Sequence, residues 1–143
     1  MIKRQFKYNQ RINQKGETAF IPYLPLLLIY NDVSLNTGGL LDTGASVNVL
    51  PHEIGLELGL NWDEHNTEVI LTGNLAQFQA KGVILSAQIE GFDSVTLVFA
   101  WTQAQNIPLL LGRVNFFQAF DVCFYGSQLI FEVALSSTKF KLQ

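Results

Sequence analysis

The sequence predicts an all-β domain that closes or curls into a barrel and carries one or two short helices. Short apolar runs of strand length recur along the chain, and turns rich in Gly, Asn and Asp separate them. The run from Ala80 to Glu90 shows the clearest period of two, with Val83, Leu85, Ala87 and Ile89 on one face. At 143 residues and 48% hydrophobic content, the chain is long enough for one domain with a sizeable core.

The first half of the chain supplies four predicted elements before its polar middle. The strands are expected at 23–30, from 33–35 and at 47–50; a turn at Asn31-Asp32 joins the first two, and a loop at 36–39 leading into Leu40-Leu41 is the fourth element. The loop is predicted because Gly38 and Gly39 adjoin each other. Pro51 suits the first position of a short helix that runs to about Leu58.

The second half predicts two hairpins. The first has arms at 68–72 and 80–90 around a polar tip at 72–77, and the second pairs 122–125 with 128–133 through Gly126-Ser127. Between them we expect a strand at 95–101, a polar loop at 102–106, an apolar run at 108–111 and a short helix at 114–120.

The segment Asp42-Thr43-Gly44 follows two leucines and precedes small residues. This order suits a buried strand that stops abruptly and presents one carboxylate, a group that proteins rarely bury unless it is paired. Thr43 can form local hydrogen bonds, and Gly44 permits close approaches that a Cβ would prevent. An ordinary turn after a strand would use the same residues, so this word alone leaves both readings open.

A second segment, Leu111-Gly112-Arg113, ends another apolar run and precedes the predicted short helix. Together the two segments resemble the retropepsin-like aspartic proteases, including their bacterial relatives, which are single-domain homodimers. In that family the Gly-Arg strand follows the Asp-Thr-Gly loop by about seventy residues. The resemblance extends from about Tyr23 to about Val133 and implies a barrel of the acid-protease type.

The resemblance implies an aspartic endopeptidase that needs no metal or cofactor. Hydrolysis by carboxylates requires two of them, one to accept a proton from water and one to donate a proton to the peptide oxygen. The chain contains one Asp-Thr-Gly motif, so a homodimer would supply one Asp42 from each subunit. Thr43 would then hydrogen-bond across the two-fold axis, and Gly44 would offer its backbone to substrate.

The same resemblance implies apolar substrate-binding walls for an extended peptide with large apolar side chains at the cleavage site. The candidate residues are Ala45, Ser46, Leu71, Thr72, Gly73, Asn74, Trp101, Pro108 and Leu109, of which 71–74 lie on the flap hairpin. Viral members often carry an acid at the position of Ser46, so Arg113 is expected to bond a main-chain carbonyl or another acid such as Asp121. Ala45 replaces the serine of pepsin-like relatives, whose hydroxyl stabilises the charged carboxylate, so we expect an optimum at weakly acidic pH.

Charge divides the chain unevenly. Residues 1–15 carry +5 and the remainder carries −8, for a net charge of −3. We therefore predict a basic arm at 1–19, a protease-like domain at 20–133 and a tail at 134–143. The brevity of the arm and the acidic body disfavour nucleic acid as a partner and favour a frayed tail, or a strand on the same fold or on a partner. A charged content of only 15% favours a buried subunit interface.

Composition also bears on location. The longest apolar stretch, Ile21 to Tyr30, is too short for a membrane span, and no signal-type stretch opens the chain. Cys123 is the only cysteine, which excludes an intrachain disulfide, and with two histidines it gives no His/Cys metal cluster. These features favour the cytoplasm. The alternative function is a non-catalytic binding or scaffolding module of the same fold, which Ser46 and the modest flap leave open.

Overall fold

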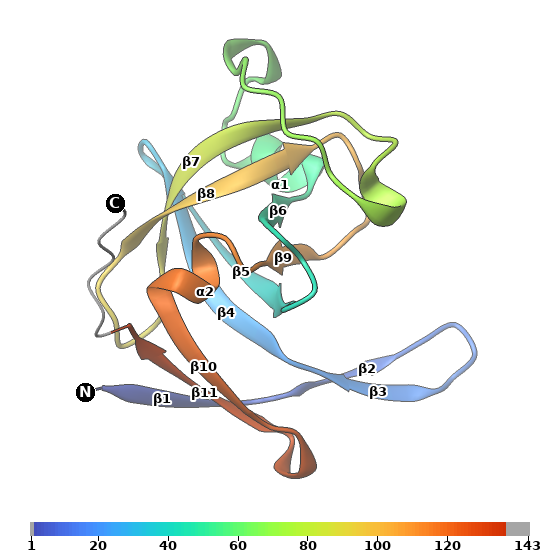
Figure 1. The fold of residues 1–143 in the computed structure, drawn as a ribbon, viewed down its shortest axis with the longest axis vertical. Helices are drawn as coiled ribbons and strands as arrows, with labels where there is room; N and C mark the ends of the chain where they lie inside the picture. Colours follow the sequence, from blue (N-terminus) through green and yellow to red (C-terminus); the bar gives the residue numbers. More distant parts are fainter. Residues whose placement is uncertain (1, 137–143) are drawn as a thin grey trace.

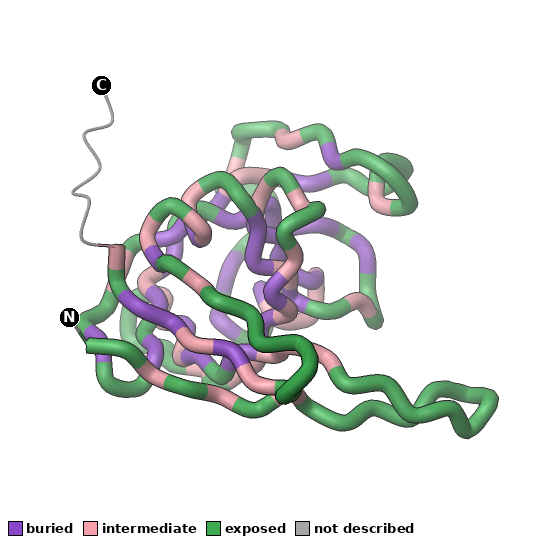
Figure 2. The backbone as a smooth tube through the Cα atoms, turned by 60° about the horizontal axis from the view of Figure 1, so that its bottom comes forward, coloured by how far each residue is buried: buried purple, intermediate pink, exposed green. Residues whose placement is uncertain are grey.

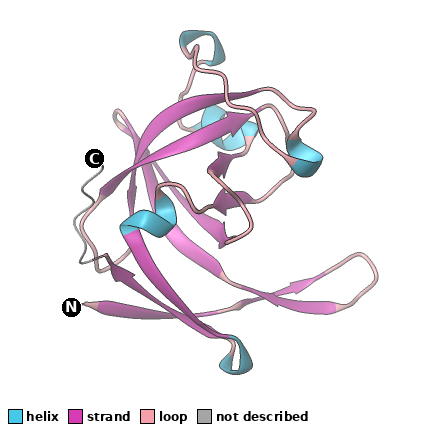
Figure 3. Cartoon of the chain, viewed as in Figure 1, coloured by secondary structure: helices cyan, strands magenta, loops and turns pink. Residues whose placement is uncertain are grey.

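The computed structural model describes residues 2–136, and Figure 3 shows that strands dominate this part of the chain. The strands are β1 (Lys3–Lys7), β2 (Asn9–Ile12), β3 (Thr18–Ile21), β4 (Tyr23–Tyr30), β5 (Val33–Leu41), β6 (Asn48–Leu50), β7 (Ala80–Gln88), β8 (Val95–Thr102), β9 (Leu109–Leu111), β10 (Phe120–Tyr125) and β11 (Ile130–Leu135). The helices are α1 (His52–Glu57) and α2 (Phe116–Ala119). Within the described residues, no helix has the length and apolar character needed to cross a bilayer. The predicted all-β class with short helices is confirmed.

Six strands form a closed barrel in the order β4-β5-β9-β6-β8-β7 (Figure 1). Alternate residues of β7 point inward, as the sequence predicted, so Val83, Leu85 and Ala87 are buried. They pack with the inward residues of β8, among which Leu97 and Phe99 have no exposed surface. The predicted closed barrel is therefore confirmed, and its interior is a packed core.

The strand β9 sits between β5 and β6 and fixes where the motif loops emerge. β5 runs parallel to β9 with Leu41 opposite Leu111, while β6 runs antiparallel to β9 with Val49 opposite Leu110. Because parallel strands end at the same edge of a sheet, the loop that follows Leu41 and the loop that follows Leu111 leave the barrel side by side.

Two predicted elements differ from the structure. The predicted loop at 36–39 is instead part of the continuous strand β5. Gly39 is needed there for packing, since a Cβ on it would lie 2.7 Å from Leu111 Cδ1. The predicted strand at 68–72 is a loop, which joins the barrel through an isolated bridge between Glu68 and Lys81. A 3₁₀ turn, Gly73–Leu75, forms the tip that the sequence placed at 72–77.

A second sheet has the order β1-β11-β10, and a separate ribbon is formed by β2 and β3. The predicted hairpin of β10 and β11 is confirmed, with Tyr125 opposite Ile130. On the inner face of this sheet the rings of Phe6 and Phe131 stack at 5.4 Å. Strands β1 and β2 lie within the segment predicted as a basic arm, and β11 extends through Leu135. Of the predicted tail, residues 137–143 lie outside the described residues.

Candidate active site

Asp42 lies in a tight turn directly after β5, and its side chain is half-buried. The backbone N–H of Gly44 donates to Asp42 Oδ1 at 2.9 Å, and that of Ala45 donates to the Asp42 carbonyl at 3.1 Å. The N–H of Asp42 itself donates to the Leu111 carbonyl at 3.0 Å, which ties the turn to β9. A Cβ on Gly44 would lie 3.2 Å from Asp42 Oδ1, so glycine allows this close approach. The carboxylate is therefore held in one orientation.

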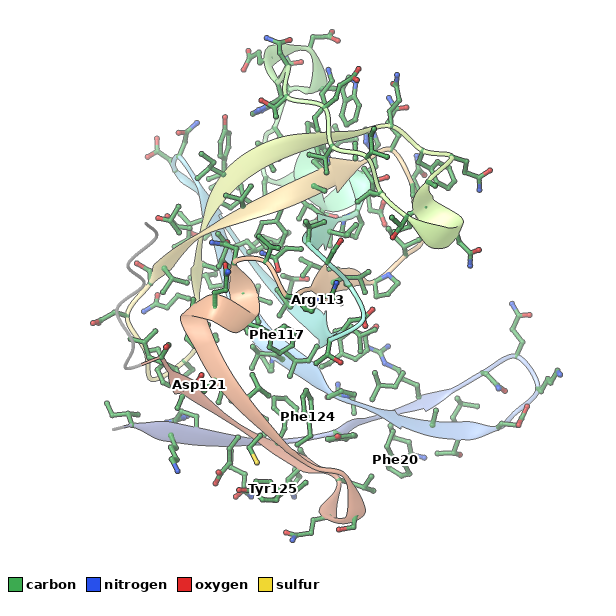
Figure 4. All side chains as sticks on the ribbon, in the orientation of Figure 1. Phe20, Arg113, Phe117, Asp121, Phe124 and Tyr125 are labelled. Carbon is green, nitrogen blue, oxygen red and sulfur yellow. The ribbon has the colours of Figure 1, made fainter. Side chains whose placement is uncertain are left out.

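Arg113 clamps the same turn from the neighbouring loop. Its Nη1 donates to the Thr43 carbonyl at 2.9 Å, and its backbone N–H donates to the Ala45 carbonyl at 2.9 Å. The adjacent Val114 N–H donates to the Ser46 carbonyl at 2.9 Å. Of the two partners predicted for Arg113, the structure shows the main-chain carbonyl. Figure 4 places Asp121 away from Arg113, on β10.

Asn48 is a structural residue of the site that the sequence reasoning missed. Its side chain is completely buried, accepts from Gly112 N–H at 2.8 Å and donates to the Val98 carbonyl at 3.0 Å. A signal was present, because Asn48 is the single polar residue in the apolar run 47–50 and a buried amide must find partners. Gly112 has no room for a side chain, since a Cβ there would lie 2.5 Å from the Val47 carbonyl oxygen.

Asn115 was also missed and begins the helix that follows the Gly-Arg motif. Its φ is 83°, and its side-chain oxygen accepts from Val98 N–H at 2.8 Å. Its own N–H donates to Gln118 Oε1 at 2.8 Å. Asn followed three residues later by Gln is a capping pattern that the sequence displays openly. Asn115 thus attaches α2 to β8, just after the clamp residue Arg113.

A small apolar cluster joins the flap segment to the strands beside Asp42. It contains Val49, Leu71, Ala80 and Ala100, with Val47, Val69, Leu75, Ile107 and Leu110 packed against it. Leu110 lies opposite Leu40 in the parallel ladder, so the two side chains share a face. Asp42, two residues after Leu40, continues on that face. The cluster therefore extends from the Asp42 turn toward the flap segment.

The other predicted wall residues divide into two groups. Thr72, Gly73, Asn74 and Pro108 are exposed, and the first three lie at the flap tip. Trp101 and Leu109 are buried in the main core, which corrects their predicted place in the walls. Trp101 donates from Nε1 to the His52 carbonyl at 3.1 Å and fills a slot that Gly55 leaves open in α1. Neither side chain offers surface to a peptide in this conformation.

Other features of the described chain lie away from this turn. A cavity of about 230 Å³ borders the flap segment, between Trp62, residues 68–70 and residues 76–81. Asp42 does not line it, so the cavity and the motif turn are separate features. Within residues 2–136 no group of three or more His, Cys, Asp or Glu side chains is placed to hold a metal ion.

Comparison with known proteins agrees with this architecture. No family model matches the chain, and no curated protein sequence does. The chain is similar to a solved structure of a retropepsin-like aspartic protease from Rickettsia conorii, with a TM-score of 0.60 and 17% sequence identity. The match covers 92% of this chain and 91% of that chain. At this identity the likeness concerns the fold. The closed barrel and this likeness together define an all-β domain of the retropepsin type.

Proposed function

We propose that this chain is an aspartic endopeptidase that hydrolyses peptide bonds with a water molecule held between two Asp42 carboxylates, one from each subunit of a homodimer. The observation that carries the proposal is the geometry of the turn. One oxygen of Asp42 is fixed by the Gly44 N–H at 2.9 Å, and Arg113 anchors the Thr43 carbonyl at 2.9 Å. A rigid, half-exposed carboxylate at the end of a barrel strand supplies half of a catalytic pair.

The reaction follows from two such groups at close range. Two adjacent carboxylates retain one proton between them, because like charges at that distance do not both form readily. The ionised member accepts a proton from water while the water oxygen bonds to the peptide carbon, and the protonated member gives its proton to the carbonyl oxygen. The resulting tetrahedral diol then collapses: one of its hydroxyls gives its proton to the ionised carboxylate, the amide nitrogen takes the proton that came from the water, and the C–N bond breaks.

Substrate recognition is proposed to use the cluster that reaches from this turn toward the flap. The partly buried Leu110 supplies apolar surface next to the buried side chains of Val49 and Leu71, and the exposed flap tip around Gly73 offers backbone groups to an extended peptide. Pairing of a peptide with the flap would resemble addition of a strand. Large apolar side chains beside the cleaved bond suit this lining, and Ala45 and Ser46 border it at the base of the turn.

The experiment compares Asp42→Asn with Asp32→Asn, a matched change at an exposed turn between β4 and β5. We expect Asp42→Asn to abolish peptide cleavage while thermal stability and dimer mass stay unchanged, and Asp32→Asn to retain activity. Undiminished cleavage by Asp42→Asn would remove the proposal. The wild-type optimum is expected at weakly acidic pH, and a maximum below roughly pH 3 would contradict the proposed pair. A dimer that is inert toward varied peptides yet binds one partner tightly would favour the binding module instead.

A further inference from the structure

The ribbon of β2 and β3, residues Asn9–Ile21, projects away from the body of the domain (Figure 1, lower right). Its pairing runs from Asn9 opposite Ile21 to Ile12 opposite Thr18. Residues 9–20 are all exposed, which Figure 2 shows as an uninterrupted green loop. An isolated two-stranded ribbon is marginally stable at best in water. This ribbon therefore lacks the cover that its own chain gives to every barrel strand.

The two faces of the ribbon differ. On one face Arg11 lies over the ring of Tyr23 at 4.5 Å, which ties the ribbon to the start of β4. On the other face Phe20 and Ile12 lie diagonally across the strands, because Phe20 pairs with Gln10 and Ile12 pairs with Thr18. Phe20 is 46% exposed and Ile12 is 69% exposed. The face of Phe20 and Ile12, which also carries Gln10 and Thr18, thus exposes two large apolar side chains.

The root of the ribbon lies beside the proposed catalytic turn. The N–H of Leu41 donates to the Pro22 carbonyl at 3.1 Å, and Leu40 lies opposite Tyr23 in the barrel. The ribbon consequently leaves the barrel at the edge where Asp42 is presented. A second subunit that brings its own Asp42 to this edge would lie next to the ribbon.

We propose that the ribbon 9–21 clasps a second copy of this chain and buries its Phe20 and Ile12 face against that copy. The inference rests on the proposed function, which places the partner at Asp42. Charge agrees with the same occupant, since residues 9–21 contain Arg11, Lys15 and Glu17, a net charge of +1, and the remainder of each chain carries −4. The weakly basic ribbon of one copy is therefore attracted to the acidic body of the other. The ribbon would thus add a second contact between the subunits to the one at the two Asp42 turns.

The test compares two double variants in an Asp42→Asn background, which prevents self-cleavage. Ile12→Ser/Phe20→Ser removes the apolar ribbon face. Ile84→Ser/Val98→Ser is the matched control, because these residues are 64% and 48% exposed and face each other across β7 and β8. We expect the ribbon variant to raise the dimer dissociation constant by about tenfold or more, measured by sedimentation equilibrium, and the control to leave it unchanged. Equal dissociation constants for the two variants would overturn the inference.

Peptide cleavage by the unmutated chain separates this inference from the proposed function. A dimer that the ribbon variant weakens, but whose parent cleaves no peptide, supports the ribbon and removes the protease. An active dimer whose dissociation constant the ribbon variant does not change supports the protease and overturns the ribbon inference. A chain that stays monomeric overturns both the protease and the ribbon inference. A photo-reactive phenylalanine at position 20 should give an adduct of two chains. If the photo-reactive residue instead cross-links to an added apolar peptide, the proposed dimer contact is overturned and the ribbon is a substrate-binding element.

Discussion

The side-chain oxygen of Asn48 accepts a hydrogen bond from the backbone N–H of Gly112 at 2.8 Å, although the two residues are 64 positions apart. The amide nitrogen of the same side chain donates to the Val98 carbonyl at 3.0 Å. One buried amide thus joins β6, β8 and the loop that carries Arg113. The Asp42 turn is anchored to that loop, so its geometry depends on this internal link.

Replacement of Asn48 by alanine should destabilise the fold by about 2–4 kcal/mol, because it leaves the Gly112 N–H and the Val98 carbonyl without partners and opens a cavity. Urea denaturation measures the change in unfolding free energy. Asn36→Ala, at an exposed position of β5, is the control and should change it by less than about 0.5 kcal/mol. Similar losses for the two variants would show that the buried link contributes little.

Gly112→Ala should be among the most damaging single changes in this chain. The added Cβ would lie 2.5 Å from the Val47 carbonyl oxygen and 2.9 Å from that of Ala45, both of which are backbone atoms. We expect a loss of about 2 kcal/mol or more, measured by thermal denaturation. Gly126→Ala is the matched control, since nothing lies within 4 Å of its added Cβ. A stable, unchanged Gly112→Ala protein would contradict the close packing of the two loops.

Arg113→Lys should separate activity from stability. The lysine cannot reproduce the guanidinium geometry that donates to the Thr43 carbonyl at 2.9 Å. Because the side chain is exposed, we expect a stability loss of no more than about 1 kcal/mol. Peptide cleavage should fall by about tenfold as the turn loosens. Arg4→Lys, whose guanidinium lies 3.9 Å from exposed Glu90, should preserve both properties, and equal effects at the two sites would argue against the clamp.

Tyr125 should titrate at unusually high pH. Its hydrogen bonds with Cys123 and then Glu132 raise the pKa of Tyr125 from 10.0 to about 12, and its hydroxyl donates to Glu132 at 3.2 Å. Because the folded pKa lies above the unfolded one, the protonated phenol favours the fold below pH 10, and this contribution is lost as the pH rises through 12. The difference in phenolate absorbance between the wild type and Tyr125→Phe should have its midpoint near pH 12. A midpoint at 10 would contradict it.

The strands were predictable where the pattern is local. The period of two in β7 follows from residues that neighbour each other, so the sequence displays it directly. The error at 36–39 has a non-local cause. Gly39 looks like a loop residue beside Gly38, yet it is required because Leu111 packs onto its strand from far along the chain. The strand predicted at 68–72 is wrong although the local pattern suits a strand. The segment forms only one bridge to β7 and therefore remains a loop.

The residues of the candidate site that belong to sequence motifs could be predicted, and those outside the motifs could not. Asp42 and Arg113 belong to recognisable sequence motifs. The role of Asn48 depends on a hydrogen bond between β6 and the loop after β9, which only the folded structure reveals. Trp101 was placed in a substrate wall because it borders a polar loop. Its burial is decided by Gly55, on a different element, where the missing side chain leaves room for the indole ring. Such complementarity cannot be inferred from the neighbours of Trp101 in the sequence.

The hydrogen bond from Arg113 to Thr43 spans 70 positions, and this has a consequence for biosynthesis. The ribosome adds Thr43 long before it adds Arg113, whose side chain donates to the Thr43 carbonyl. Until residue 113 has been added, the nascent chain lacks this hydrogen bond to the turn that carries its aspartate. The proposed peptide cleavage would therefore begin only after residue 113 has been made, and the growing chain would not digest itself during synthesis.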